Sequence, residues 1–179
     1  MLAIRLATMV DLEPLTDLMD RAINELQKGF LDAQQIAASR AIMGIDTQLI
    51  RDETYFVVLW NGALAGCGGW SFRKTLYGGD HSTDLRDRGR LDPSCDAAKI
   101  RAMYTHPDFT RRGVGRAILK VSEDAARAAG FKRAEMMATL AGVPLYERCG
   151  YQVIEKVQCT PAGGVDGISV PLLRMGKAL

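Results

Sequence analysis

A loop rich in glycine and arginine, set between an extended run and a helical pattern, constrains this chain more than any other feature. The extended run is 98–105, and the loop that follows carries Arg111, Arg112, Gly113 and Gly115. The first turn of a helix leaves backbone N–H groups without intrahelical partners and carries partial positive charge. Glycine lets the backbone approach a ligand closely, and arginine adds full charges. The segment therefore predicts that a pyrophosphate group binds at the start of a helix.

Two common phosphate-binding motifs do not fit this loop. A Walker loop ends in Gly-Lys-Ser/Thr, but here Gly115 is followed by Arg116 and Ala117. A dinucleotide-binding fingerprint needs a small residue three positions after its second glycine, and that position is Ile118. The loop must therefore serve a different kind of phosphate ligand.

A second segment, Leu145–Tyr151 with the sequence LYERCGY, lies on a predicted short helix and narrows the choice of phosphate ligand. Together with Thr110–Gly115, TRRGVG, it resembles the GNAT superfamily of N-acyltransferases. Members of that family carry a (Q/R)-x-x-G-x-(G/A) loop at a helix start and, after the next strand, an (L/F)-Y-x-x-x-G-(F/Y) segment. Thr110 differs from the usual Gln or Arg. The resemblance covers residues 1–179 as a single domain.

The resemblance implies an α+β fold with a central mixed, mostly antiparallel sheet of about six to seven strands flanked by about four helices. The residue patterns predict a matching series of elements. The expected strands are 2–7, 54–60, 63–71, 99–105, 132–139, 151–157 and 168–175, and the expected helices are 11–28, 32–43, 113–129 and 143–149. Asn61-Gly62 is a strong hairpin signal, and Gly66, Gly68 and Gly69 indicate a bulge or a close approach of another group.

Two segments fall outside this pattern. Residues 72–97 combine Gly78-Gly79, Pro93 and many charges with little apolar periodicity, and a loop of this length is usually functional or disordered. The glycine-rich stretch 161–167 joins the last two expected strands.

Composition sets the outer limits on function. With 179 residues, 47% hydrophobic and 25% charged, the chain suits one soluble domain, and its net charge of +2 gives no reason to expect nucleic acid. No apolar run is long enough to cross a membrane, and Arg5 and Asp11 break up the start that a secretory signal would need. Four cysteines without metal-ligand spacing indicate a reduced, cytoplasmic protein with no metal site.

The resemblance also implies the chemistry. Acetyl-CoA is the expected co-substrate, and a primary amine of a small molecule or a protein attacks it directly. Tyr146 would protonate the leaving thiolate; otherwise it is a buried packing residue. The expected cofactor-binding residues are Met103, Tyr104, Thr105, Arg111, Arg112, Gly113, Val114, Gly115, Arg116, Thr139 and Leu140. Relatives often form homodimers, so a homodimer is also expected by resemblance.

The general base is not evident from the sequence. Lys99 and Arg101 are unsuited to the role, and Glu135 is expected to be a solvated strand residue. Asp80 and His81 lie in the 72–97 segment, and either could reach a substrate amine, although an exposed histidine in a loop usually has no such role. His106 is expected to have a structural role before Pro107. Trp70 is expected to lie either in the core or in the acceptor pocket. Arg86, Arg88 and Arg90 are expected on a solvated face.

Two other hypotheses about function are compatible with the sequence. A CoA-binding sensor without turnover would explain the missing base. A nucleotide- or RNA-binding module would explain the arginine clusters, but the chain lacks the basic excess and the aromatic platforms of such modules.

Overall fold

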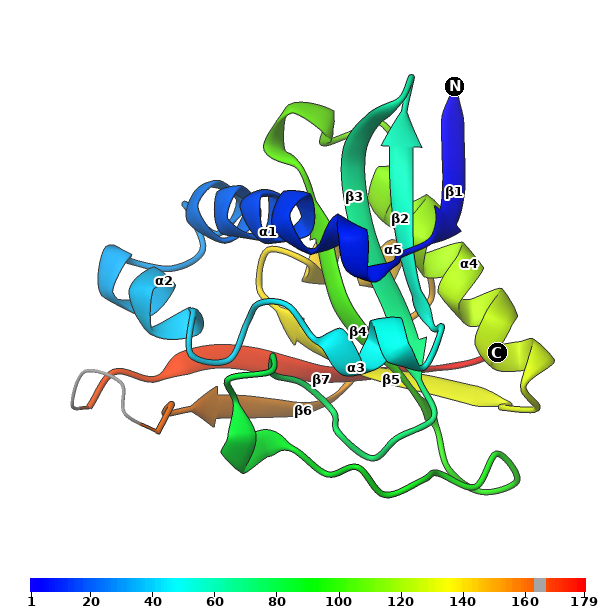
Figure 1. Ribbon diagram of the computed structural model, residues 1–179. Helices are drawn as coiled ribbons and strands as arrows, with labels where there is room; N and C mark the ends of the chain where they lie inside the picture. The colour runs from blue at the N-terminus through cyan, green and yellow to red at the C-terminus, as the bar shows by residue number, and fades with distance from the viewer. Residues whose placement is uncertain (163–166) are drawn as a thin grey trace.

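A mixed sheet organises the chain (Figure 1). The computed structural model describes residues 1–162 and 167–179, and within them the sheet has seven strands in the order β1-β2-β3-β4-β5-β7-β6. The strands are β1 (Leu2–Leu6), β2 (Tyr55–Trp60), β3 (Ala63–Ser71), β4 (Ala98–Thr105), β5 (Arg133–Thr139), β6 (Gln152–Cys159) and β7 (Val170–Ala178). The helices are α1 (Leu12–Leu26), α2 (Ala33–Ser39), α3 (Thr47–Arg51), α4 (Val114–Ala128) and α5 (Val143–Arg148), with the 3-10 turns η1 (Met9–Asp11), η2 (Thr83–Leu85) and η3 (Pro107–Phe109). The expected α+β architecture is confirmed.

Strands β4 and β5 part after a short paired stretch. They run parallel and pair only at Ala98–Ala134 and Lys99–Glu135, whereas every other neighbouring pair in the described sheet is antiparallel. In Figure 1 β4 then continues upward with β1–β3, while β5 runs across the molecule with β6 and β7. The sheet therefore opens between β4 and β5.

The backbone of β4 is irregular where the strands part. Ala102 has a φ of +49°, a conformation that non-glycine residues seldom adopt, and the register against β3 shifts between Cys67 and Gly69. The buried Tyr55 hydroxyl donates a hydrogen bond of 2.8 Å to the Ala102 carbonyl and so holds this bulge in place.

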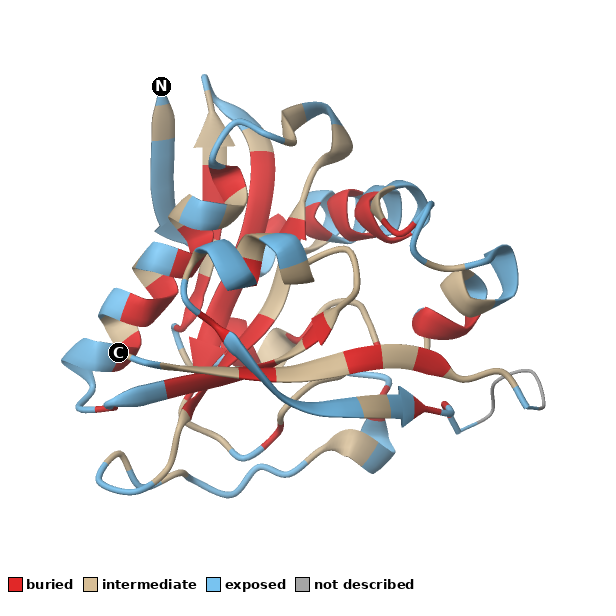
Figure 2. Ribbon diagram, turned by 180° about the vertical axis from the view of Figure 1, so that it is seen from behind, coloured by how far each residue is buried: buried red, intermediate tan, exposed pale blue. Residues whose placement is uncertain are grey.

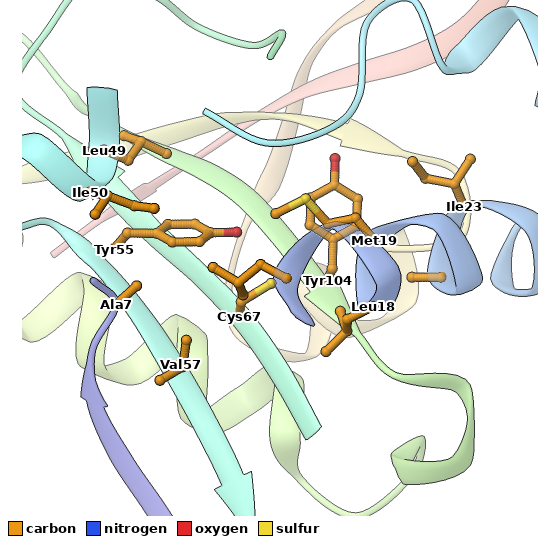
Figure 3. Close-up of a cluster of buried hydrophobic side chains, with 12 residues drawn as sticks. Ala7, Leu18, Met19, Ile23, Leu49, Ile50, Tyr55, Val57, Cys67 and Tyr104 are labelled. Atoms are coloured by element: carbon orange, nitrogen blue, oxygen red, sulfur yellow. The ribbon is translucent and has the colours of Figure 1, made fainter. Parts of the chain in front are cut away.

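Helices α1 and α4 cover opposite faces of the first four strands. Leu18, Met19 and Ile23 of α1 join Tyr55 and Val57 in one core cluster (Figure 3). Strand β3 is buried along most of its length, whereas the edge strands β1 and β6 are largely exposed (Figure 2). Each face of the sheet is thus closed by an amphipathic helix.

The glycines of β3 permit a close approach of α4, as the sequence indicates. A Cβ at Gly66 would lie 2.5 Å from Val114 Cγ1, and one at Gly68 would lie 2.5 Å from Ile118 Cγ2. Any larger side chain at these positions would push α4, and with it the loop at its start, away from the sheet.

Some element boundaries differ from the sequence expectation. Helix α2 ends at Ser39 instead of Met43, because the next residues form i to i+3 turns. Helix α3 was not expected; it has five residues and begins where the Asp46 carboxylate accepts the Gln48 N–H. Of the stretch expected to join the last two strands, residues 163–166 lie outside the described part of the chain.

The buried face of α4 also differs from the one that helical periodicity predicts. It consists of Val114, Ile118, Leu119, Ser122, Glu123 and Ala126. Helical periodicity predicts a buried stripe of Val114, Ile118, Val121 and Ala125, but Val121 and Ala125 are only partly buried. Glu123 takes a buried position because its carboxylate accepts hydrogen bonds of 3.1 and 3.0 Å from Lys177 on β7, a pairing that helical periodicity cannot reveal.

The 72–97 segment is fastened to residues 40–46, which we call the connector. The Asp80 N–H donates to the Ile45 carbonyl at 2.9 Å, the Ser82 hydroxyl donates to the Ala41 carbonyl at 2.7 Å, and a ring nitrogen of His81 lies 2.7 Å from the Arg40 carbonyl oxygen. These bonds give a segment with little regular structure a defined path beside the connector.

A buried carboxylate, Asp46, lies at the centre of this region. It is 1% exposed, and its Oδ2 accepts hydrogen bonds from Arg101 on β4 at 2.7 Å and from Arg86 in the 72–97 segment at 2.9 Å. Arg86 was expected on a solvated face, and that expectation is wrong because Asp46 draws its guanidinium inward. The expectation for Glu135 is wrong too: it is buried and pairs with Lys99 and Arg174.

We expect Asp46→Ala to lower the free energy of unfolding by about 3–5 kcal/mol, because the substitution leaves Arg101 buried without its counter-charge. Urea denaturation followed by circular dichroism measures the change. Asp20→Ala is the control, since Asp20 is 54% exposed in its pair with Arg40 and should cost less than about 1 kcal/mol. Equal effects of the two substitutions would show that the buried cluster does not hold the fold.

Candidate active site

The gap between β4 and β5 continues into a groove of about 640 Å³, bounded by the end of α1, the start of α4 and α5. Most of the residues expected to bind the cofactor or to act in catalysis line it. They are Met103, Tyr104, Thr105, Arg111, Gly113, Val114, Gly115, Arg116, Thr139 and Tyr146. Segments distant in sequence thus meet where the sheet opens.

Arg112 and Leu140 do not line the groove. The Arg112 guanidinium lies over the rings of Trp60 and Phe109, 5.5 Å from each centroid, in a cation–π contact. Leu140 lies in the turn between β5 and α5.

The start of α4 has the geometry of an anion site. Gly113 caps the helix with a φ of +80°, and Arg111 before it has a φ of +61°. The Ala117 N–H reaches the Gly113 carbonyl at 2.9 Å, so the N–H groups of the three preceding residues have no carbonyl within the helix. They point out of the helix start with its partial positive charge.

The arginines of this loop add charge that the protein does not neutralise. Arg111, Arg112 and Arg116 are exposed, and none of them forms a salt bridge with any residue that the structure describes. Cations at a helix N-terminus oppose the helix dipole. An anionic ligand would reverse that unfavourable arrangement.

The edge of β4 facing the gap is free for a ligand. On its other side the His106 N–H still bonds to the Ala65 carbonyl at 2.9 Å, but beyond Lys99 the strand has no ladder partner on β5. Backbone N–H and C=O groups seldom stay unpaired, so an extended amide-containing ligand suits this edge. The Tyr104 side chain has a further role, because its oxygen accepts the Gly44 N–H at 2.8 Å and anchors the connector.

Tyr146 lies at the inner end of the groove. It is 9% exposed, and its ring packs edge-on against Tyr151 and directly over Gly142, where a Cβ would lie 2.5 Å away. Burial raises the pKa of Tyr146 to about 12, so the phenol is protonated at neutral pH. No described residue hydrogen-bonds to its hydroxyl, which leaves the proton free for a bound molecule.

A smaller cavity of about 80 Å³, which we call the side cavity, meets the groove beside Tyr146. Its walls come from the connector, from residues 76–78 and from β4 and β5. The two cavities share Met43, Met103, Tyr104, Thr139 and Tyr146.

The residues considered as bases are engaged elsewhere. Burial alone would raise the pKa of Glu135. Hydrogen bonds from Lys99 and Arg174 have the larger combined effect, so the pKa lies below its usual value. His81 contacts the connector, and His106 has the expected structural role, because its Nδ1 accepts the Asp108 N–H. Trp70 is 6% exposed and packs in the core with Phe72 and Phe131.

The first helix and the connector also contribute to the groove, which no sequence motif indicates. Leu26, Gln27 and Phe30 line the groove from the end of α1, and Met43 lines it from the connector. The amphipathic pattern of α1 identifies its buried face, but it does not indicate which buried residues border a cavity.

Neither a metal centre nor a membrane span is present in the described part of the chain. No three residues among the described His, Cys, Asp and Glu come close enough to hold a metal ion. None of the described helices combines the length and the apolar character needed to cross a bilayer.

Comparison with known proteins assigns the family. Residues 19–151 match the family model described as acetyltransferase (GNAT) family, so the chain belongs to this family and is an acetyltransferase. A search of curated proteins found no match.

Solved structures share the fold at low sequence identity. A GCN5-related N-acetyltransferase of Rhodopseudomonas palustris is 17% identical with a TM-score of 0.70, covering 99% of this chain and 95% of its own. The PaiA N-acetyltransferase of Thermoplasma acidophilum, solved with coenzyme A, is 14% identical with a TM-score of 0.63, covering 100% and 99%. The yncA protein of Salmonella typhimurium, solved with its cofactor acetyl-CoA, is 19% identical with a TM-score of 0.62, covering 100% and 94%.

We expect none of the five tyrosines of the native protein to ionise below about pH 11, since burial raises the pKa of each above the usual value of about 10. Absorbance at 295 nm should stay flat to that pH in buffer and rise with a midpoint near 10 in urea. A one-tyrosine step near pH 10 that disappears in Tyr146→Phe would show that the Tyr146 phenol is not shielded.

Proposed function

We propose that this protein transfers an acetyl group from acetyl-CoA to a primary amine by direct attack, with Tyr146 as the general acid. The observation that carries the proposal is the single groove that joins an anion-binding helix start, an unpaired strand edge and a protonated phenol. These three features match the pyrophosphate, the amide-containing arm and the thioester sulfur of acetyl-CoA in that order. The complexes of the PaiA and yncA proteins with coenzyme A and acetyl-CoA support this choice of co-substrate.

The residues that would hold acetyl-CoA follow from the geometry. The free N–H groups of Val114, Gly115 and Arg116 and the charge of Arg111 suit the pyrophosphate. The β4 edge at Met103 and Thr105 suits the amides of the pantetheine arm. Gly115 leaves little room for a side chain, since a Cβ there would lie 2.7 Å from Leu145 Cδ2.

The reaction requires two proton movements. A C–N bond forms between the amine and the acetyl carbon, and the C–S bond breaks. The Tyr146 phenol donates its proton to the sulfur, which leaves as a thiol, and the phenolate regains a proton from water. Since no His, Asp or Glu lines the groove within the described residues, the amine enters neutral, and the one proton that its nitrogen loses on forming the amide leaves to water.

Binding of acetyl-CoA is the first test. Calorimetry should show micromolar affinity in the wild type and loss of binding in Gly113→Trp, because an indole there blocks the helix start. Gly62→Trp is the matched control: Gly62 has a similar φ of +86°, also has no neighbour within 4 Å, and lies in the β2–β3 hairpin away from the groove. A folded wild type that does not bind acetyl-CoA would refute the proposal.

Tyr146→Phe tests the chemical role. We expect kcat to fall about 100-fold or more, while the Kd of acetyl-CoA changes little, because only proton donation is lost. In the wild type kcat/KM should rise with pH up to the pKa of the amine, since no group of the protein accepts its proton. An unchanged kcat in Tyr146→Phe would assign Tyr146 to packing alone.

A CoA-binding sensor without turnover is the second candidate. The lack of a carboxylate or a histidine in the described lining of the groove favours it. Acetyl-CoA binding without acetylation of any amine would support the sensor.

A further inference from the structure

The side cavity has an unusual lining. Four of the eight methionines of the chain, Met43, Met103, Met136 and Met137, surround it. Methionine side chains are flexible and polarisable, and they adapt to apolar ligands of different shape. Such a concentration at a cavity that borders the candidate active site suggests a ligand-binding role.

The side cavity begins where acetyl transfer is proposed to occur. Tyr146 and Thr139 border both cavities. An amine that reaches the thioester beside Tyr146 can therefore extend the rest of its structure into the side cavity, while acetyl-CoA fills the groove.

The charges around the side cavity are balanced. Arg101 is the one charged residue in its described lining, and its guanidinium donates to Asp46 at 2.7 Å, to the Gly78 carbonyl at 2.7 Å and to the Thr75 carbonyl at 3.1 Å. Arg86 shares Asp46 and lies 3.6 Å from Asp80. Two cations thus face two anions, and the cavity offers no free charge to a ligand.

Two hydroxyls of the lining are also engaged. The Tyr104 hydroxyl accepts the Gly44 N–H, and the Tyr77 hydroxyl lies 3.5 Å from the Cys159 sulfur. The Tyr146 hydroxyl, where the two cavities meet, has no partner among the described residues, but it is neutral. A second ammonium or a carboxylate entering the cavity would therefore be desolvated without an opposite charge, which is strongly unfavourable.

The walls are held in place before any ligand binds. The Ser82 bond to Ala41, the Asp80 bond to Ile45 and the Arg86–Asp46 ion pair fasten the 72–97 segment to the connector. The cavity therefore selects among ligands by its size as well as by its lack of charge.

We propose that the side cavity binds the uncharged tail of the acceptor, and that the acceptor is a short-chain monoamine with an alkyl or thioether tail. This inference rests on the proposed acetyl transfer. An apolar cavity of about 150 Å³ takes benzene. The side cavity of about 80 Å³ by the same scale takes a tail of roughly three to four non-hydrogen atoms.

A panel of amines of matched length tests the class of acceptor. With purified full-length protein and acetyl-CoA, kcat/KM for butylamine should exceed that for 1,4-diaminobutane and 4-aminobutanoate by about 100-fold or more, because each of these adds one charge at the far end of the tail. Preference for the diamine or the amino acid, or no transfer to butylamine by protein that binds acetyl-CoA, would overturn the inference. Failure to bind acetyl-CoA would instead remove the proposed function on which it rests.

Leu76 provides a test of the location, because it lines the side cavity and not the groove. Leu76→Phe should reduce kcat/KM for butylamine about tenfold or more while ethylamine is still acetylated, and Leu76→Ala should shift the preference toward hexylamine. The Kd of acetyl-CoA should stay within about twofold in both. Leu91→Phe, in the same segment but lining neither cavity, is the control. An unchanged order of preference in both Leu76 variants would place the tail elsewhere.

Discussion

The parting of β4 and β5 is the constraint on which the rest of the structure depends. Two strands that pair at Ala98–Ala134 and Lys99–Glu135 and then separate leave backbone groups without ladder partners along both edges. Burial of such groups is costly unless something pairs with them. The fold meets this requirement by holding the gap open as a groove, with the positive-φ Ala102 and the Tyr55 hydroxyl setting the bend of β4. A ligand with its own amides can then complete the sheet.

The irregular parts of the chain shape the other side of this opening. The connector and the 72–97 segment have little regular structure, yet the buried Asp46 draws them together by binding Arg86 and Arg101. The same ion cluster that stabilises these segments leaves the side cavity electrically neutral. Stability and acceptor selection would thus depend on one set of charges.

Tyr146 shows how burial can prepare a group for chemistry. Desolvation favours the neutral phenol, and neither Gly142 nor Tyr151, against which the ring packs, hydrogen-bonds to its hydroxyl. The described lining of the groove contains three arginines but no carboxylate or histidine. Such a site suits a reaction in which the protein supplies a proton and orientation, while water takes up the proton that the amine releases.

Several local features of this protein follow directly from short stretches of its sequence. The TRRGVG loop, the Asn61-Gly62 hairpin and the β3 glycines are set by conformational limits on a few adjacent residues, and the resemblance in two short motifs was enough to predict the family and the overall sheet. Which polar residues are buried depends on contacts between distant segments, as in the cases of Glu135, Arg86 and Glu123. The tertiary structure also places Arg112 over two aromatic rings and creates the side cavity from segments far apart in the chain. The periodicity of a sequence indicates which face of a helix or strand is apolar. A charged side chain can be buried only beside a partner of opposite charge, and only folding brings that partner within reach.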